Sequence, residues 1–365
     1  MFYCPTRIIF GKEAMQKAGA YLVNLGTKPM IVCGKQSAKL CGALDEAIAI
    51  LKKQGMNATI FDDISENPSL ESIIAGKEMF ITKGCNLLIG IGGGSPIDAA
   101  KAISLAAAND LEKEQLYKTE LFTKAYPIVA VPTTSGTGSE VTQYSVLTDF
   151  RQKKKAGLGH ILAFPKLAVL DPKYTFSLPD TVTLHTSLDA LSHLLEGLYS
   201  NQRNPLVYPL VYKGIASIMK CLPQILQDKE NYAARVELMQ ASLYGGMVIA
   251  QGSTTFQHAI GYPLTSHYNI PHGLANALAM EAVMELYYPA VKAELEGLFA
   301  YLNCTYSSFI SWLKVLPFQQ HHALSDSFIE EAIPLVMSAR NMALNPVEIS
   351  EEQVRLVYEK IRMPQ

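Results

Sequence analysis

Two polar residues interrupt an apolar helical pattern in the stretch SLDALSHLLEGLYS, which covers residues 187–200. Its leucines recur at the spacing that places them along one side of a helix. Asp189 and His193 lie four residues apart and close to that apolar stripe. Side chains at this spacing share a helical face, so this carboxylate and this imidazole can point at one spot. Because a core helix would carry leucines there, both are candidate functional residues.

Two histidines further along the chain complete a candidate metal site. His258 and His272 are fourteen residues apart, with His258 in one predicted helix and His272 at the start of the next. With Asp189 and His193 they offer one oxygen and three imidazole nitrogens, a donor set that suits Fe²⁺, Zn²⁺, Co²⁺ or Mn²⁺. A single histidine is more often structural than a ligand, but four donors in this pattern predict a divalent-cation site. A position left open to a substrate oxygen would make the cation a Lewis acid.

The stretch NLLIGIGGGSPIDAAKAIS, residues 86–104, has the pattern of a strand, a glycine turn and a helix. Its glycines, Gly92 to Gly94, would let backbone N–H groups and a helix N-terminus approach a diphosphate. The pattern is not GxGxxG and lies on the fourth predicted strand, so it is not the ordinary dinucleotide fingerprint. A tight turn without a ligand is the alternative. A second loop, VPTTSGTGSEVT at residues 131–142, adds hydroxyls that suit ribose and phosphate.

The first half of the chain alternates β-like runs with helical patterns, which predicts a mainly parallel sheet with helices on its faces. We expect strands at residues 7–10, 29–33, 58–61, 86–92, 127–131 and 167–171. We expect the helices between them at residues 12–25, 37–54, 69–83 and 95–108. Beyond residue 180 helical periodicity dominates, at residues 187–200, 206–228, 232–250, 273–287 and near the C-terminus.

The predicted fold class is therefore an α/β N-terminal domain with a Rossmann-like sheet, joined to an all-α C-terminal domain. The pattern changes at the stretch DPKYTFSLPD, which contains Pro172 and Pro179. We predict a dinucleotide-binding domain at residues 1–179 and a helical metal-binding domain at residues 180–365. The active site is expected in the cleft between them, a favoured place for ligands.

Composition narrows the class of protein. The net charge is −2 without an acidic or basic tail, which argues against nucleic acid or an anionic membrane as a partner. No charge-free apolar run reaches the roughly 18 residues of a membrane span, and the N-terminus lacks the pattern of a signal peptide. The six cysteines form no CxxC pair, so we expect reduced thiols and a cytoplasmic protein.

Four stretches together carry a family resemblance: GGGSPIDAAKAI, PTTSGTGSEVT, SLDALSHLLEGLYS and HAIGYPLTSHYNIPHGLANA. In this order and spacing the chain closely resembles the iron-containing (group III) alcohol dehydrogenases, whose superfamily also holds glycerol dehydrogenase and dehydroquinate synthase. The resemblance covers nearly the whole chain and implies the dehydroquinate synthase-like architecture. It also implies a homodimer or higher homo-oligomer, because the counterparts of the N-terminal stretch TRIIFG pair across a dimer in relatives.

The resemblance implies roles for residues of this sequence. The implied metal ligands are Asp189, His193, His258 and His272. The implied cofactor-binding residues are Asn67, Gly92, Gly93, Gly94, Ser95, Asp98, Thr133, Thr134, Thr137 and Lys155. Lys155 ends the basic run RQKKK, residues 151–155, which by itself is typical of a solvated turn. Fe²⁺ is the implied metal, with Zn²⁺ or another divalent metal as alternatives.

Gly34 is a departure from the family pattern. Many relatives have an acidic residue at this place, just after the second strand, that accepts hydrogen bonds from the adenosine ribose. Without that carboxylate a 2′-phosphate meets no repulsion, and Lys35 and Ser37 could contact one. We therefore predict that NADP(H) is favoured over NAD(H), with Gly34 and Lys35 at the cofactor's adenosine end. A flexible turn that accepts either cofactor is the alternative.

Tyr262 is a second departure. Several relatives have a histidine at this place, four residues after the third ligand, and that histidine is often proposed to shuttle a proton. Tyr262 is thus a candidate catalytic residue for the proton relay. The interpretation that we favour gives the relay to water and ribose hydroxyls, with Tyr262 shaping the pocket.

Taken with the resemblance, the sequence predicts a metal-dependent, NAD(P)(H)-using alcohol dehydrogenase or aldehyde reductase. The expected substrate is a small, mostly uncharged primary alcohol or aldehyde, and short diols and hydroxy acids are further candidates. Two other classes are alternatives. A metal-dependent lyase or cyclase on the same fold would use the nucleotide only transiently, and a non-catalytic nucleotide-binding protein would not turn it over.

Overall fold

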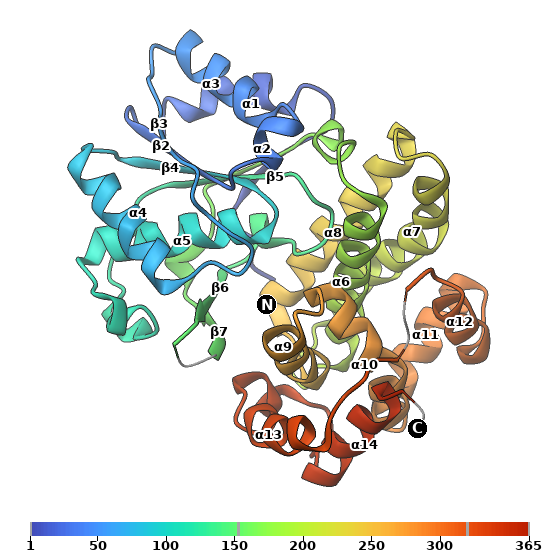
Figure 1. The fold of residues 1–365 in the computed structure, drawn as a ribbon. Coiled ribbons are helices and arrows are strands. Elements are labelled where there is room, and N and C mark those ends of the chain that lie inside the picture. The colour runs from blue at the N-terminus through green and yellow to red at the C-terminus, as the bar shows by residue number, and fades with distance from the viewer. Residues whose placement is uncertain (1, 152–153, 319–320, 364–365) are drawn as a thin grey trace.

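The computed structural model describes residues 2–151, 154–318 and 321–363. An α/β part formed by the N-terminal half packs beside a helical part formed by the C-terminal half (Figure 1). The sheet strands are β1 (Arg7–Phe10), β2 (Pro29–Cys33), β3 (Thr59–Phe61), β4 (Leu87–Gly92), β5 (Ile128–Pro132) and β8 (Leu167–Leu170). The helices between them are α1 (Ala14–Leu22), α2 (Ser37–Leu40), α3 (Ala43–Lys53), α4 (Leu70–Thr82) and α5 (Gly94–Asn109).

The six strands form one parallel sheet in the order β1-β8-β5-β4-β2-β3. Alternate residues of a strand feed two cores. Ile31 packs with α1 and α3, whereas Met30 and Val32 pack with α4 and α5 on the other face. A strand covered on both faces has a continuous apolar sequence. For that reason all six strands were predictable to within one residue at each end, and the mainly parallel sheet is confirmed.

Two predicted elements differ from the observed ones. A single helix at residues 37–54 is wrong, because Gly42 adopts a left-handed φ of 79° and separates α2 from α3. The basic run at residues 151–155 is only partly a turn. An antiparallel hairpin of β6 (Tyr144–Asp149) and β7 (Lys154–Gly159) was not predicted, and its second strand begins inside that run. Residues 152 and 153 lie outside the described residues.

The C-terminal half is helical, as predicted, and packs around one large apolar core. Its first helix, α6, begins at Asp180, seven residues earlier than the predicted start at residue 187. The helices are α6 (Asp180–Tyr199), α7 (Tyr208–Gln227), α8 (Tyr232–Gly252), α9 (Phe256–Tyr268), α10 (His272–Tyr287), α11 (Lys292–Leu302), α12 (Tyr306–Lys314), α13 (Asp326–Met337) and α14 (Glu351–Ile361). The boundary at residues 179 and 180 stays a prediction.

Two features of the surface concern partners. β1 lies at one end of the sheet order, so the edge of β1 opposite β8 is a place where a second copy could pair; the oligomeric state stays a prediction. Within the described ranges, no helix combines the length and the apolar character needed to cross a membrane.

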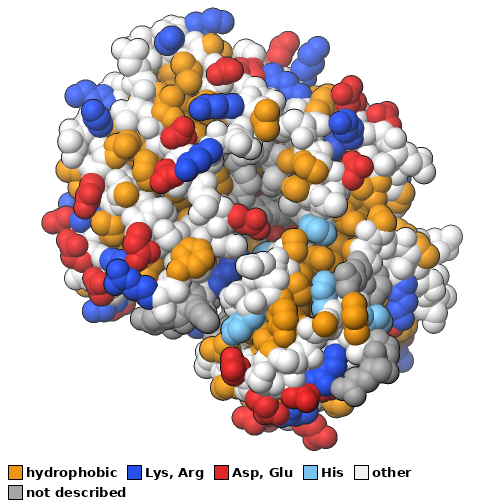
Figure 2. Space-filling model, in the orientation of Figure 1, with side chains coloured by type: hydrophobic (Ala, Val, Ile, Leu, Met, Phe, Trp, Pro, Cys, Tyr) orange, Lys and Arg blue, Asp and Glu red, His pale blue; other side chains and the backbone are white. Residues whose placement is uncertain are grey.

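Figure 2 shows a hollow in the surface between the α/β part and the helical part, with acidic and histidine side chains near it.

Candidate metal and cofactor site

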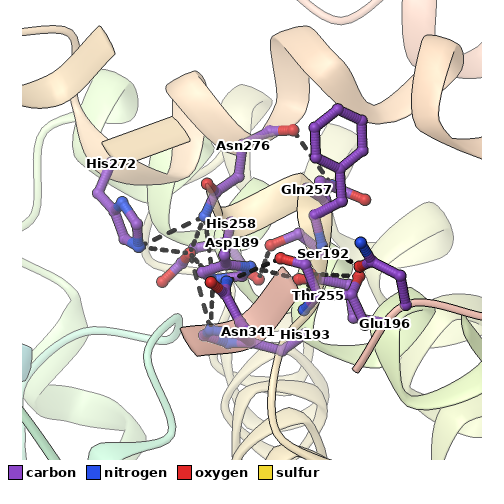
Figure 3. A network of polar contacts seen from close by, with 12 residues as sticks. Asp189, Ser192, His193, Glu196, Thr255, Gln257, His258, His272, Asn276 and Asn341 are labelled. Carbon is purple, nitrogen blue, oxygen red and sulfur yellow. Dashed lines mark hydrogen bonds and ion pairs between the residues drawn. The ribbon is translucent and has the colours of Figure 1, made fainter. Parts of the chain in front are cut away.

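Four polar side chains converge where α6, α9 and α10 meet (Figure 3). Asp189 and His193 come from consecutive turns of α6, where their four-residue spacing puts them on one face. His258 lies in the first turn of α9, and His272 is the first residue of α10. The structure therefore brings together all four residues that the sequence singled out as a donor set.

The separations between the donor atoms suit a small cation. Asp189 Oδ1 lies 3.9 Å from His193 Nε2, 3.8 Å from His258 Nε2 and 3.9 Å from His272 Nε2. The two nitrogens His193 Nε2 and His258 Nε2 are 3.1 Å apart. Ligands held tetrahedrally at the usual metal–ligand distances lie roughly 3.4 Å from one another. Ligand atoms of Asp189, His258 and His272 all lie within 4.8 Å of one another, and His193 Nε2 lies close to two of them, so the group suits a divalent cation that accepts oxygen and nitrogen donors.

The protonation states fit a cation as well. Burial lowers the pKa of His193, and burial together with the charge of Lys155 lowers the pKa of His272 well below its usual value. Neutral imidazoles expose a nitrogen lone pair, which a metal requires. Burial raises the pKa of Asp189, but its electrostatic interactions with the three histidine rings and a hydrogen bond from Asn276 outweigh burial, so the net shift is downward. The site therefore offers one anionic and two neutral donors in addition to His258.

His258 differs from the other two histidines because a carboxylate lies on its far side. Burial lowers the pKa of His258, but the charge of Glu196 and its hydrogen bond raise the pKa by more than burial lowers it. The net shift of the His258 pKa is therefore upward. Glu196 is fully buried and contacts His258 Nδ1 directly. A hydrogen bond at Nδ1 leaves Nε2 facing the other donors.

The glycine turn after β4 and the hydroxyl loop after β5 lie side by side at the carboxyl edge of the parallel sheet. The backbone N–H of Thr133 donates to the carbonyl of Gly92 at 2.8 Å. A Cβ atom at Gly94 would lie 2.8 Å from Thr137, so only glycine allows the two loops to come this close. The carboxyl edge of an open α/β sheet is where such folds bind nucleotides.

The other predicted cofactor residues gather around these loops. Gly93 and Thr134 face each other, with 3.4 Å between Thr134 and the place of a Cβ on Gly93. The backbone N–H of Asn67 donates to Ser95 Oγ at 3.2 Å, which joins the loop before α4 to the start of α5. Gly34 follows Cys33, whose partner in the sheet is Ile91, so it lies near the glycine turn.

Asp98 lies one turn into α5, but its carboxylate is engaged by the chain itself. It accepts hydrogen bonds from Ser139 Oγ at 2.5 Å and from the backbone N–H of Val146 at 2.9 Å. Ser139 belongs to the hydroxyl loop, and Val146 follows the loop in β6. Asp98 thus fixes the loop's position, and a direct contact with the cofactor stays a prediction.

Lys101 completes this network and was not singled out from the sequence. Its ammonium is fully buried and donates to Ser139 Oγ at 2.7 Å, to Thr142 Oγ1 at 3.2 Å and to the carbonyl of Tyr144 at 2.7 Å. Asp98 Oδ1 is 3.8 Å away. Burial lowers the pKa of Lys101 to about 8, although nearby carboxylates oppose the shift. One buried cation therefore holds the hydroxyl loop to α5.

The hydroxyl loop also packs directly against the helical part. Gly138 has a left-handed φ of 61°, and a Cβ on it would lie 2.3 Å from the Cα of Gly246 in α8. A side chain at either glycine would separate the loop from the helix. The residues predicted to hold the nicotinamide are thus fixed against the helical part, whose helices α6, α9 and α10 bear the metal donors.

Lys155 and Tyr262 lie between the two loops and the metal donors. The Lys155 Nζ is 5.9 Å from the centre of the Tyr262 ring. That ring stacks on the imidazole of His272, with centroids 5.5 Å apart and an interplanar angle of 4°. Burial lowers the pKa of Lys155. The negative charges of Asp189, Glu66 and Asp98 partly offset this downward shift. The hairpin that was not predicted is therefore what carries Lys155 to the site.

Comparison with known proteins identifies the family. Residues 5–172 match the family model described as iron-containing alcohol dehydrogenase, and residues 183–316 match the model of the C-terminal part of the Fe-containing alcohol dehydrogenase family. The chain belongs to the iron-containing alcohol dehydrogenase family. As in that family, a site for a divalent metal is implied, and the grouping of Asp189, His258 and His272 fits it.

Several iron-containing alcohol dehydrogenases are similar to this chain. An NADPH-dependent butanol dehydrogenase from Clostridium saccharobutylicum is 32% identical, and the match covers 78% of this chain and 73% of the relative. A 1,3-propanediol dehydrogenase from Citrobacter freundii is 31% identical over 77% of this chain and 74% of the relative. A crystal structure of an iron-containing alcohol dehydrogenase from Thermotoga maritima has a TM-score of 0.91 and 34% identity, with 99% of both chains covered.

Two polar residues of this alcohol dehydrogenase site were missed by sequence reasoning. Asn276 follows His272 by four residues, and its Nδ2 lies 3.1 Å from Asp189 Oδ1 and 3.1 Å from His258 Nε2. Glu196 follows Asp189 by seven residues. Both spacings, four and seven, return to the same helical face. A search for polar residues one or two helical turns beyond Asp189 and His272, on the same helix face, would have found Glu196 and Asn276.

Proposed function

We propose that this protein catalyses reversible hydride transfer between a small primary alcohol and NADP(H). The observation that carries the proposal is the convergence of Asp189, His193, His258 and His272 beside two loops suited to a dinucleotide. A cation held by these four side chains would stabilise negative charge on the substrate oxygen, and the nicotinamide would carry the hydride. The same residues serve both directions, oxidation of the alcohol and reduction of the aldehyde.

In this proposal, each part of the chain has a separate task. Gly92 to Ser95 and the N-terminus of α5 bind the diphosphate through backbone N–H groups. Thr133, Thr134 and Thr137 bind the nicotinamide half, while Asn67 and Lys155 contact the cofactor nearby. Packing of the hydroxyl loop on α8 fixes the distance from the cofactor to the donor set, and correct placement of reacting groups is a large part of catalysis.

We infer that NADP(H) is favoured over NAD(H). A Cβ atom on Gly34 would lie 3.1 Å from the carbonyl oxygen of Ile64, so a residue larger than glycine at this position would crowd that carbonyl. Lys35 forms an exposed ion pair with Asp63, at 3.0 Å, which is weak enough to exchange for a phosphate. We expect a kcat/KM for NADPH at least about tenfold above that for NADH, which corresponds to ~1.4 kcal/mol. Equal values, or a higher value for NADH, would contradict this inference.

Tyr262 is proposed to shape the pocket instead of relaying the proton. Burial, and then the carboxylates of Glu196, Asp189 and Asp98, raise the pKa of Tyr262 far above the neutral range, so its hydroxyl keeps its proton and is a poor acid. Its ring packs between Lys155 and His272. We expect Tyr262→Phe to keep kcat within about threefold and to leave the pH profile of kcat unchanged, because general acid–base groups contribute about 10²–10⁴-fold. A hundredfold loss of kcat would assign the relay to Tyr262.

The substrate class follows from what the relatives are named for and from the site. The relatives include a butanol dehydrogenase and a 1,3-propanediol dehydrogenase. Two apolar residues near the stretches that carry the resemblance do not line the donor set: Leu264 is in the helical core, and Tyr144 lines a cavity of about 360 Å³ formed by other residues. We therefore propose a small primary alcohol, with diols and hydroxy acids as further substrates.

The experiment that tests the function is an absorbance assay of NADPH with a panel of short aldehydes. Net oxidation of NADPH that depends on the aldehyde is the expected result. A lyase or cyclase of the same fold, or a non-catalytic nucleotide-binding protein, would bind NADPH without consuming it. Tight binding with no loss of absorbance for any aldehyde would therefore reject the dehydrogenase.

A further inference from the structure

Glu196 joins two of the elements that carry the metal donors. It lies on α6, one turn beyond His193, with no exposed surface. One of its oxygens, Oε2, contacts His258 Nδ1. The other, Oε1, accepts hydrogen bonds from the backbone N–H of Thr255 at 2.6 Å and from its hydroxyl at 2.9 Å (Figure 3).

These contacts place a carboxylate at the N-terminus of α9. Thr255 is the residue before Phe256, where α9 begins, and its own side chain does not cap the helix. A negative charge is stabilising at this end of a helix because the first backbone N–H groups point toward it. The same carboxylate therefore fixes both the start of α9 and the ring of His258, three residues further along.

We propose that Glu196 is a positioning residue of the metal site, an inference that rests on the proposed function. Its carboxylate accepts a hydrogen bond from the Nδ1–H group of His258. This holds the ring proton on Nδ1 and leaves Nε2 as the unprotonated nitrogen that faces Asp189 and His193. Pairs of a carboxylate and a metal-binding histidine act in this way, and their loss typically weakens metal affinity by 10–100-fold. Glu196 itself binds no substrate or cofactor and acts through His258.

Replacing Glu196 by glutamine keeps the shape but removes one acceptor. If the amide oxygen faces His258, the amide N–H group faces the two donors of Thr255. If the amide N–H group faces His258 instead, the ring must present a bare Nδ1, which moves its proton to Nε2 and toward the cation. Both arrangements set a donor against a donor, and a buried polar group left without a partner is costly.

The test is the affinity for Co²⁺, measured by competition with a chelator and by the Co²⁺ absorption spectrum. We expect Glu196→Gln to bind Co²⁺ 10–100-fold more weakly than the wild type, while NADPH binding stays within twofold. Glu294→Gln is the matched control, since Glu294 is a carboxylate of the helical part that pairs with Arg203 at 2.7 Å, away from the donor set. Its Co²⁺ affinity is expected to equal that of the wild type.

The outcomes separate this inference from the proposed function. Wild-type affinity in Glu196→Gln overturns the role of Glu196 and leaves the metal site standing. Absence of Co²⁺ binding in the wild type overturns both. Where Glu196→Gln does not fold, Thr255→Val decides the matter, because it removes the hydroxyl that holds Oε1 and leaves the pair with His258. A loss of Co²⁺ affinity of at least threefold then supports the role, and an unchanged affinity rejects it.

Discussion

Removal of the divalent cation is expected to lower kcat/KM for aldehyde reduction by at least about 1,000-fold. A Lewis acid at a reacting oxygen contributes several kcal/mol, and about 1.4 kcal/mol corresponds to a factor of ten. The measurement is the rate of NADPH oxidation after dialysis against a chelator, with elemental analysis of the protein. Addition of Fe²⁺ or Zn²⁺ to the dialysed protein should restore the rate, and the metal that restores it best identifies the preference.

Asp189→Ala is the genetic counterpart of that experiment. Asp189 is the only anionic donor of the set, and its Oδ1 lies within 3.9 Å of an Nε2 nitrogen from each of the three histidines. The variant should lose activity as fully as the dialysed wild type and should not recover when metal is added. NADPH binding serves as the control, because the cofactor loops lie outside the donor set. Full activity in protein shown to be free of metal would contradict a metal-dependent mechanism.

The sequence predicted the half of the metal site that depends on local spacing. Asp189 and His193 share a helix, so their convergence follows from helical geometry alone. The meeting of His258 and His272 with that pair depends on how α9 and α10 pack on α6. No local sequence pattern predicts how helices pack on one another. His258 and His272 were therefore predicted as ligands from their residue type and from the family resemblance.

The groups that were missed are the ones whose function depends on burial. Glu196 stands among leucines of α6, where a charged residue usually marks a solvent-exposed position. Lys101 stands among the alanines of α5, and its buried state follows from the loop that covers it. Lys155, by contrast, was named through the family resemblance. Its run of charges alone is typical of a solvated turn, and the pairing of β6 with β7 is what brings it to the site. A one-dimensional pattern does not contain these long-range contacts.

Lys101 therefore offers a test of how firmly the cofactor loop is held. Its ammonium is the donor for two oxygens of the loop and for one carbonyl of β6, and it lies beside the carboxylates of Asp98 and Glu140. Burial raises the pKa of Glu140 to about 7, so removing its cationic neighbour leaves a second ionisable group buried without compensation. Breaking a buried pair by deleting one partner typically costs about 3–5 kcal/mol.

Lys101→Met is expected to lower the free energy of unfolding by about 3–5 kcal/mol and the thermal midpoint by about 4–7 °C. The KM for NADPH should rise as well, because Ser139, Thr142 and the carbonyl of Tyr144 lose the donor that holds them to α5. Thermal unfolding followed by circular dichroism measures the first effect, and steady-state kinetics measures the second. Lys360→Met is the matched control, since the exposed pair between Lys360 and Glu285 should contribute less than about 1 kcal/mol. Equal midpoints for the two variants would show that the buried ammonium does not hold the loop, and the loop's position would then depend on its glycine contacts with α8.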